Sequence, residues 1–173
     1  MESFDKGGYY LMNEKNSKTM IRCGAFKDRP AQSDNLHLDI WIGGINYLWD
    51  TGTYKYNTTA KLNNYFKGVE GHNTIGINEK DQMLKGGRFI WYNWTNWAKG
   101  LLEKTDDQFV FKGEIIGFKE LGKDIHHQRM VSKNTAKLEW RINDSIKNID
   151  NVTIHQYWHV NPACKEKISI TAK

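Results

Sequence analysis

The segment from residue 34 to residue 42 alternates between polar and apolar side chains, and its odd positions include His37, Asp39 and Trp41. On a strand these three residues share one face at a spacing of ~6–7 Å, while the Leu and Ile residues between them face the core. One interpretation is a polar sheet face exposed to solvent. The other is the floor of a binding cleft, where Trp41 stacks on a sugar and His37 and Asp39 bond to its hydroxyl groups.

Two further polar positions stand where predicted strands end or begin. Asp50 precedes Thr-Gly, which is typical of a carboxylate that caps a turn, and His72 with Asn73 opens a strand after Gly71. Carboxylate and imidazole both suit zinc, so Asp50 and His72 would supply most of a metal site if a third ligand converged on them. The chain has no His-x-His or Cys-x-x-Cys spacing that would indicate metal binding independently.

Aromatic residues gather between Asp81 and Trp97, where the last seven residues hold four large rings. One interpretation is a core strand with an aromatic edge. The alternative is a carbohydrate platform on which Arg88 pairs in a bidentate manner with the carboxylate of an acidic sugar. His126 and His127 are adjacent on an alternating strand, so we expect one at the surface and the other in the core.

Several classes of protein are excluded by their missing motifs. The sequence has no Gly-x-Ser-x-Gly, no phosphate-binding loop, no dinucleotide-binding glycine pattern and no His-Glu-x-x-His. Its acidic residues are scattered among lysines and do not suggest the carboxylate pair of a glycosidase.

Short strands must position these residues. Stretches rich in β-branched and aromatic residues recur between Gly, Asn and Asp, and they predict an all-β fold: a two-layer antiparallel β-sandwich of the jelly-roll or supersandwich kind, with about twelve strands. Gly43-Gly44 predicts a tight hairpin turn. Only Thr58–Phe66 is predicted to be helical, with Thr59 as its cap. The predicted strands are 8–13, 19–26, 36–42, 45–49, 73–78, 88–94, 99–105, 108–114, 125–132, 137–144, 152–160 and 167–171.

Length and composition agree with a single β domain. The chain has 173 residues, 13% of them aromatic, and a mean hydropathy of -0.72. We expect residues 1–6 to be a leading linker without a signal peptide and residues 7–173 to be the domain. The apolar runs are too short to span a membrane. The net charge of +5 is dispersed, which argues against nucleic-acid binding. Cys23 and Cys164 are expected to be buried free thiols, although a disulfide between them is the alternative.

A set of ordered motifs strengthens the case for carbohydrate chemistry. They are Arg29-Pro-Ala-Gln-Ser-Asp34, Asp50-Thr-Gly-Thr-Tyr54, Gly71-His-Asn-Thr74, Asp81-Gln-Met83 and Gly87-Arg-Phe-Ile-Trp91. Together they resemble the C-terminal domain of the heparinase II/III-like polysaccharide lyases, in the branch that has an Arg-Pro-x-Gln-x-Asp motif. The resemblance covers roughly residues 7–97.

The resemblance implies a β-sandwich that follows an N-terminal α/α toroid, with an acidic polysaccharide, such as a glycosaminoglycan or an alginate-like chain, in the cleft between the two domains. Such lyases act by β-elimination: a uronate carboxyl is neutralised, its α-proton is removed, and the glycosidic oxygen leaves. The main catalytic residues belong to the toroid, so we expect this domain alone to be inactive. The resemblance also implies a bacterial cell-envelope or periplasmic location, or association with surface-polysaccharide synthesis.

Position by position, Asp50 and His72 match the family's metal ligands, and the resemblance implies zinc. The third ligand, usually His, falls on Gln32, with His37 as the alternative, while the family's catalytic His falls on Pro30. The alternatives to a lyase domain are a carbohydrate-binding module and a purely structural domain. The candidate substrate contacts are Arg29, His37, Asp39, Trp41, Tyr54, His72, Asn73 and Arg88.

Overall fold

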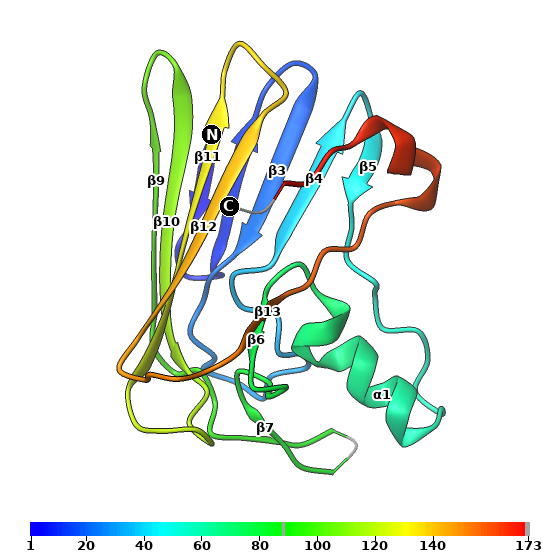
Figure 1. The fold of residues 1–173 in the computed structure, drawn as a ribbon, viewed down its shortest axis with the longest axis vertical. Helices are drawn as coiled ribbons and strands as arrows, with labels where there is room; N and C mark the ends of the chain where they lie inside the picture. Colours follow the sequence, from blue (N-terminus) through cyan, green and yellow to red (C-terminus); the bar gives the residue numbers. More distant parts are fainter. Residues whose placement is uncertain (88, 172–173) are drawn as a thin grey trace.

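The computed structural model describes residues 1–87 and 89–171, which form antiparallel sheets and one short α-helix (Figure 1). The first large sheet has the strand order β1-β2-β3-β4-β5, and the second has the order β12-β11-β10-β9. Two small sheets pair β13 with β6 and β7 with β8. The all-β prediction is therefore confirmed.

The strands of the first sheet are β1 (Glu2–Phe4), β2 (Tyr9–Asn13), β3 (Ser17–Arg22), β4 (Leu38–Ile42) and β5 (Ile45–Leu48). Those of the second are β9 (Ala98–Lys104), β10 (Gln108–Gly117), β11 (Ile125–Asn134) and β12 (Trp140–Lys147). The remaining elements are α1 (Ala60–Lys67), η1 (Val69–Gly71), β6 (Ile75–Ile77), β7 (Leu84–Lys85), β8 (Trp91–Tyr92), β13 (Ile154–Gln156) and η2 (Pro162–Lys167).

Local signals placed several elements correctly. Gly43 and Gly44 both have positive φ angles, of 58° and 81°, and they connect β4 to β5 as a tight turn requires. The helix α1 begins one residue after Thr59, whose hydroxyl accepts a hydrogen bond from the Leu62 backbone N–H at 3.4 Å.

Other expectations need correction. The segment 167–171 is not a strand: Asn161 caps the backbone N–H of Ala163, and a 3₁₀ helix then runs to Lys167. β4 starts at Leu38 because Leu36 has a φ angle of 61°, which interrupts the extended backbone. Within the expected linker, residues 2–4 form β1 and pair with β2. Of the described residues in the predicted strand 88–94, the two residues of β8 are extended, and position 88 lies outside the described residues.

The two large sheets pack face to face around one apolar core. Ile21 and Leu38 of the first sheet are fully buried in it, as are Phe111 and Val131 of the second. The strand alternation therefore predicted the core face correctly. Cys23 and Cys164 are buried and free, so no disulfide joins them. Among the described helices, none is long and apolar enough to cross a membrane.

A buried polar bridge also joins the second sheet to the first. The Arg129 guanidinium on β11 pairs in a bidentate manner with Asp144 on β12, at 2.8 Å for both bonds. Its Nη1 donates to the backbone carbonyls of Leu36 at 2.7 Å and Asn73 at 2.6 Å. His127 also contacts Asp144, at 2.8 Å, so the carboxylate is surrounded by donors. The buried Arg129–Asp144 pair is thus bonded to the loop before β4 and to the loop before β6, and these strands belong to two other sheets.

We predict that Arg129→Met lowers the free energy of unfolding by ~3–5 kcal/mol, because the Asp144 carboxylate would remain buried without its partner. Arg141→Met on the neighbouring strand is the matched control: its side chain is 76% exposed, and the expected change is within ~0.5 kcal/mol. Urea unfolding of both variants makes the comparison. Equal stability of the two variants would contradict the structural role of the bridge.

Candidate functional site

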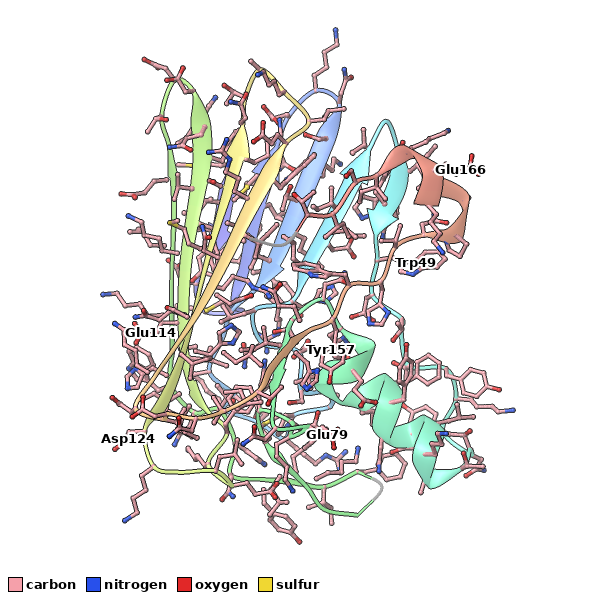
Figure 2. The ribbon with its side chains drawn as sticks, in the orientation of Figure 1. Trp49, Glu79, Glu114, Asp124, Tyr157 and Glu166 are labelled. Carbon is pink, nitrogen blue, oxygen red and sulfur yellow. The ribbon has the colours of Figure 1, made fainter. Side chains whose placement is uncertain are left out.

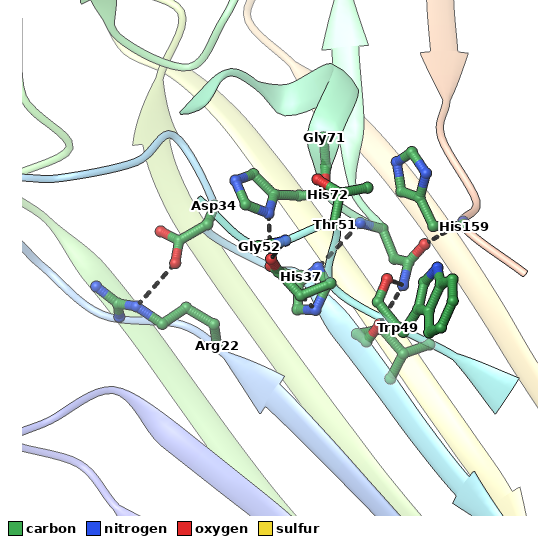
Figure 3. A network of polar contacts seen from close by, with 12 residues as sticks. Arg22, Asp34, His37, Trp49, Thr51, Gly52, Gly71, His72 and His159 are labelled. Atoms are coloured by element: carbon green, nitrogen blue, oxygen red, sulfur yellow. Dashed lines mark hydrogen bonds and ion pairs between the residues drawn. The ribbon is translucent and has the colours of Figure 1, made fainter. Parts of the chain in front are cut away.

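The candidate site is built around Asn73, which lies in the buried loop between η1 and β6. Its side-chain amide donates to the carbonyls of Leu38, at 2.8 Å, and Trp49, at 3.1 Å. Its side-chain oxygen accepts the backbone N–H of His159 at 2.6 Å. Asn73 thus holds the ends of β4 and β5 and the C-terminal segment against one another (Figure 3). Trp49 itself lies at the end of β5, on the side of the molecule that carries α1 and η2 (Figure 2).

Next to Asn73, His72 forms a hydrogen-bonded pair with Asp50. The distance from His72 Nδ1 to Asp50 Oδ2 is 2.7 Å, and the His72 side chain is fully buried. The other oxygen of Asp50 accepts the backbone N–H of Gly52 at 2.5 Å, which is the turn cap expected from the sequence. The Thr51 hydroxyl donates to the Gly71 carbonyl at 2.8 Å, so the two loops are also joined directly. One oxygen of Asp50 therefore caps the turn, and the other faces His72.

His37 completes the group from the start of β4. Its Nδ1 accepts the backbone N–H of Asn73 at 2.9 Å, and its Nε2 lies 3.8 Å from Asp50 Oδ2. The rings of His37 and His72 meet edge to face, with their centroids 5.6 Å apart. Burial, and then the neighbouring charge of His72, lower the pKa of His37 to about 3. His37 is therefore a neutral imidazole at physiological pH.

These hydrogen bonds fix where the protons lie. A backbone N–H can only donate, so His37 Nδ1 is the acceptor and neutral His37 carries its proton on Nε2, which faces Asp50. His72 donates Nδ1–H to the Asp50 carboxylate, which leaves its buried Nε2 without a partner among the described residues. Burial alone would raise the pKa of Asp50, but the hydrogen bond from His72 and the charge of His72 lower it. The Asp50 carboxylate is therefore held by one imidazole N–H group, that of His72, while His37 Nε2 faces it at 3.8 Å without a hydrogen bond among the described residues.

The same three side chains could hold a metal ion. One ligand atom from each of His37, Asp50 and His72 lies within 4.8 Å of the others, and these atom types suit zinc. In the observed arrangement, however, protons occupy the two nitrogens that face Asp50. Binding a metal through His37 Nε2 would require this ring to change tautomer and to lose its hydrogen bond from Asn73, whereas His72 keeps an Nε2 atom without a partner among the described residues.

The third ligand expected from the resemblance is Gln32, whose side-chain amide donates to the carbonyl of Phe66 at 3.4 Å. Pro30 is buried. The structure thus brings together Asp50 and His72 as expected and adds His37, which was the alternative ligand.

The other candidate contacts differ in their exposure. Asp39 is buried, and burial raises its pKa to about 6, whereas Trp41 on the same strand is 42% exposed. Tyr54 is 58% exposed and stacks on Phe66 with ring centroids 5.1 Å apart. Arg29 is exposed. The predicted contact Arg88 lies outside the described residues.

Sequence reasoning missed residues whose partners are remote in the chain. Arg22 Nε lies 3.6 Å from Asp34 Oδ2, and this pair borders the histidines (Figure 3). His159 Nε2 donates to the carbonyl of Glu70 at 2.8 Å, in addition to the contact of its backbone with Asn73. Arg129 holds the Asn73 carbonyl from the second sheet. The sequence offered only the charge or ring of each residue, with no local partner to indicate its position.

The protein is thus an antiparallel β-sandwich with a buried His/Asp/His group at one end. Comparison with known proteins shows the family to which it belongs. Residues 1–172 match the family model described as "Heparinase II/III-like, C-terminal". The chain therefore belongs to this family of C-terminal domains. This finding confirms the family that the motifs indicated.

Individual relatives are lyases that are much longer than this chain. A heparin-sulfate lyase from Bacteroides thetaiotaomicron is 22% identical over 168 residues, which cover 87% of this chain and 21% of that protein. A heparinase III gene product matches with a TM-score of 0.74 at 17% identity, and a mutant heparan sulfate lyase from Pedobacter heparinus with 0.73 at 18%. Both structural matches cover 92% of this chain and 24% of the other. This chain thus spans about a fifth to a quarter of its relatives' length.

The proton positions in the site can be tested by NMR. In long-range ¹H–¹⁵N spectra at neutral pH without added metal, His37 should show an unprotonated Nδ1 and a protonated Nε2, because Asn73 donates to Nδ1. His126 is the matched control with the opposite tautomer, since its Nδ1 faces the Glu114 carboxylate at 2.5 Å. A proton on His37 Nδ1 would contradict the arrangement described here.

Proposed function

We propose that this chain is the C-terminal domain of a polysaccharide lyase that cleaves uronate-containing polysaccharide by β-elimination. In this proposal the domain forms one wall of the substrate cleft, and an N-terminal α/α toroid of the same protein forms the other. The observation that carries the proposal is the family match over residues 1–172, in a chain that spans about a fifth to a quarter of the lyases it resembles. We further propose a bacterial cell-envelope location, or a role beside surface-polysaccharide synthesis.

The polar site fits the role of a cleft wall better than that of an independent catalytic centre. His72 is fully buried and His37 nearly so, and each ring is held by a specific hydrogen bond. Such a group fixes the geometry of the loops around it. The exposed Trp41 and Tyr54 would offer flat faces to sugar rings, and Arg29 would offer a positive charge to carboxylates or sulfates.

A second candidate function is a carbohydrate-binding domain in a protein without lyase activity. The specific observation in its favour is Pro30, which stands where the family resemblance implies a catalytic His. A proline side chain cannot exchange protons. Both candidates place acidic polysaccharide against this domain, and they differ only in whether the complete protein cleaves it.

We predict that the 173-residue chain binds heparan sulfate oligosaccharides but releases no unsaturated uronate from them, because the toroid would supply the main catalytic groups. Trp41→Ala should weaken binding ~2- to 10-fold through lost ring stacking. Trp97→Ala is the matched control: it is similarly exposed and contacts His126, a residue of the second sheet. Calorimetry measures affinity, and ultraviolet absorbance detects the unsaturated product.

Two outcomes would contradict the proposal. Failure of the wild-type chain to bind any acidic oligosaccharide would remove the substrate role. Formation of unsaturated product by the chain alone would show that its own residues suffice for elimination.

We also propose that the His37–Asp50–His72 group binds zinc, with a change of tautomer in His37. The support is the proximity of the three ligand types. Bound zinc would hold the two loops together by its positive charge. The chain's own residues hold these loops by hydrogen bonds in the arrangement described above.

Elemental analysis after dialysis against zinc should find a stoichiometric zinc ion in the wild-type chain and none above background in Asp50→Asn, which loses the carboxylate ligand. Asp39→Asn is the control, since it removes a buried carboxylate of the same region that is not in the group. Circular dichroism verifies that both variants fold. Zinc-free wild-type protein, or equal zinc in all three proteins, would refute this site.

A further inference from the structure

A separate pocket lies between helix α1 and the turn that follows β7, which are neighbours at the lower end of the view in Figure 1. Its volume is about 390 Å³. The side of α1 contributes Asn63 and Asn64, and the turn contributes Lys85 and Gly86. The residues that line it are all different from His37, Asp50 and His72, so the pocket is distinct from the candidate site.

Lys85 is the unusual residue of this pocket. Its Nζ is buried and has no hydrogen-bond partner among the described residues, although an ammonium group can donate three hydrogen bonds. The nitrogen lies over the Trp91 ring, 4.4 Å from its centroid, and this cation–π contact replaces only part of the lost hydration. Burial, and then the charge of Lys67, lower the pKa of Lys85 to about 8. A buried ammonium without a hydrogen-bonding acceptor is costly, and a bound anion would remove that cost.

The charges around Lys85 are a second lysine and one carboxylate. Lys67, at the end of α1, is also buried and lies 4.6 Å from the centroid of the Phe89 ring. The acidic group that interacts with Lys85 is Asp81, and it already accepts the Val69 backbone N–H at 2.7 Å. The carboxylate nearest in charge to Lys85 is thus directed toward the start of η1 and makes no hydrogen bond to Lys85.

The remaining walls indicate the kind of ligand that would carry this anion. The hydroxyl group of Thr58 and the amides of Asn63 and Asn64 offer both donors and acceptors. Such groups suit a ligand that has hydroxyl groups beside its charge. A sugar with a carboxylate or a sulfate group has this chemistry, whereas an apolar acid would leave the amides unpaired.

We propose that this pocket binds the carboxylate or sulfate group of an acidic sugar, with Lys85 as the principal contact. The charged oxygen would accept hydrogen bonds from Lys85 Nζ, and sugar hydroxyl groups would pair with Asn63 and Asn64. That the ligand is a sugar chain rests on the function proposed above. The preference for an oxyanion rests on Lys85 alone, and a free ion is the other source of the same chemistry.

The test is a titration of the ¹⁵N-labelled 173-residue chain with sodium sulfate, sodium acetate and a heparan sulfate oligosaccharide, at constant ionic strength. The backbone amides of Gly86 and Asn64 should shift, with saturation, in wild type. Lys85→Met should weaken oligosaccharide binding by about tenfold or more, because a charge-assisted hydrogen bond is lost. Lys61→Met on the exposed face of α1 is the matched control, and we expect its affinity to stay within about twofold of wild type.

Lys85→Met also has a diagnostic effect on stability. If Lys85 only supports the fold, the variant should have a lower melting temperature. If its ammonium is kept for a ligand, the variant should melt at the same or a higher temperature without ligand and should lose the stabilisation that the oligosaccharide gives to wild type.

The outcomes separate this proposal from the function proposed above. Oligosaccharide binding that is equal in wild type and Lys85→Met would overturn the pocket proposal and leave the polysaccharide role intact. Shifts of Gly86 with sulfate or acetate, without oligosaccharide binding, would support an oxyanion pocket and overturn the polysaccharide role. Absence of saturable shifts with all three probes would overturn the pocket proposal outright.

Discussion

The guanidinium group of Arg129 is the constraint on which the arrangement of this domain depends. It is fully buried between the sheets, and its donors are divided between Asp144 on the neighbouring strand and the carbonyls of Leu36 and Asn73. A buried arginine is tolerated only when its charge is paired and its N–H groups are satisfied. The two loops that present His37 and Asn73 must therefore approach β11 closely. The second sheet, which contributes none of His37, Asp50 and His72, in this way holds the two loops that carry His37 and His72.

Asn73 connects Arg129 to the candidate site. Its carbonyl accepts from Arg129, its backbone N–H donates to His37, and its side chain joins three other segments. Because the backbone N–H of Asn73 can only donate, this one bond determines the tautomer of His37. The proton on His37 Nε2 then faces the Asp50 carboxylate, as does the proton of His72. A metal ion at this position would compete with an intact hydrogen-bond network, which is why zinc binding and proton placement have to be measured together.

The two ends of helix α1 lie near two different sites. Past its C-terminal end, η1 leads into His72 and the polar site, where His72 is bonded to Asp50 but the Nε2 atoms of His37 and His72 have no hydrogen-bond partner among the described residues. Toward its N-terminal end, the pocket beside β7 contains Lys85, whose buried ammonium also has no hydrogen-bond partner in the described part of the chain. An unsatisfied charge beside a cavity favours an external ligand.

The sequence by itself determined the elements whose signals are local. Alternation placed Leu38 and Ile40 in the core, Gly43-Gly44 specified the β4–β5 turn, and Thr59 marked the start of α1, because each depends on neighbours a few residues away. Motif spacing identified the family and singled out Asp50 and His72. Only the tertiary structure decided that His37 would join them, since the φ angle of Leu36 turns the chain before β4 and Arg129 holds that turn from 93 residues away. The pocket at Lys85 was equally invisible in the sequence, because burial and the absence of a partner are properties of packed neighbours and not of residue type.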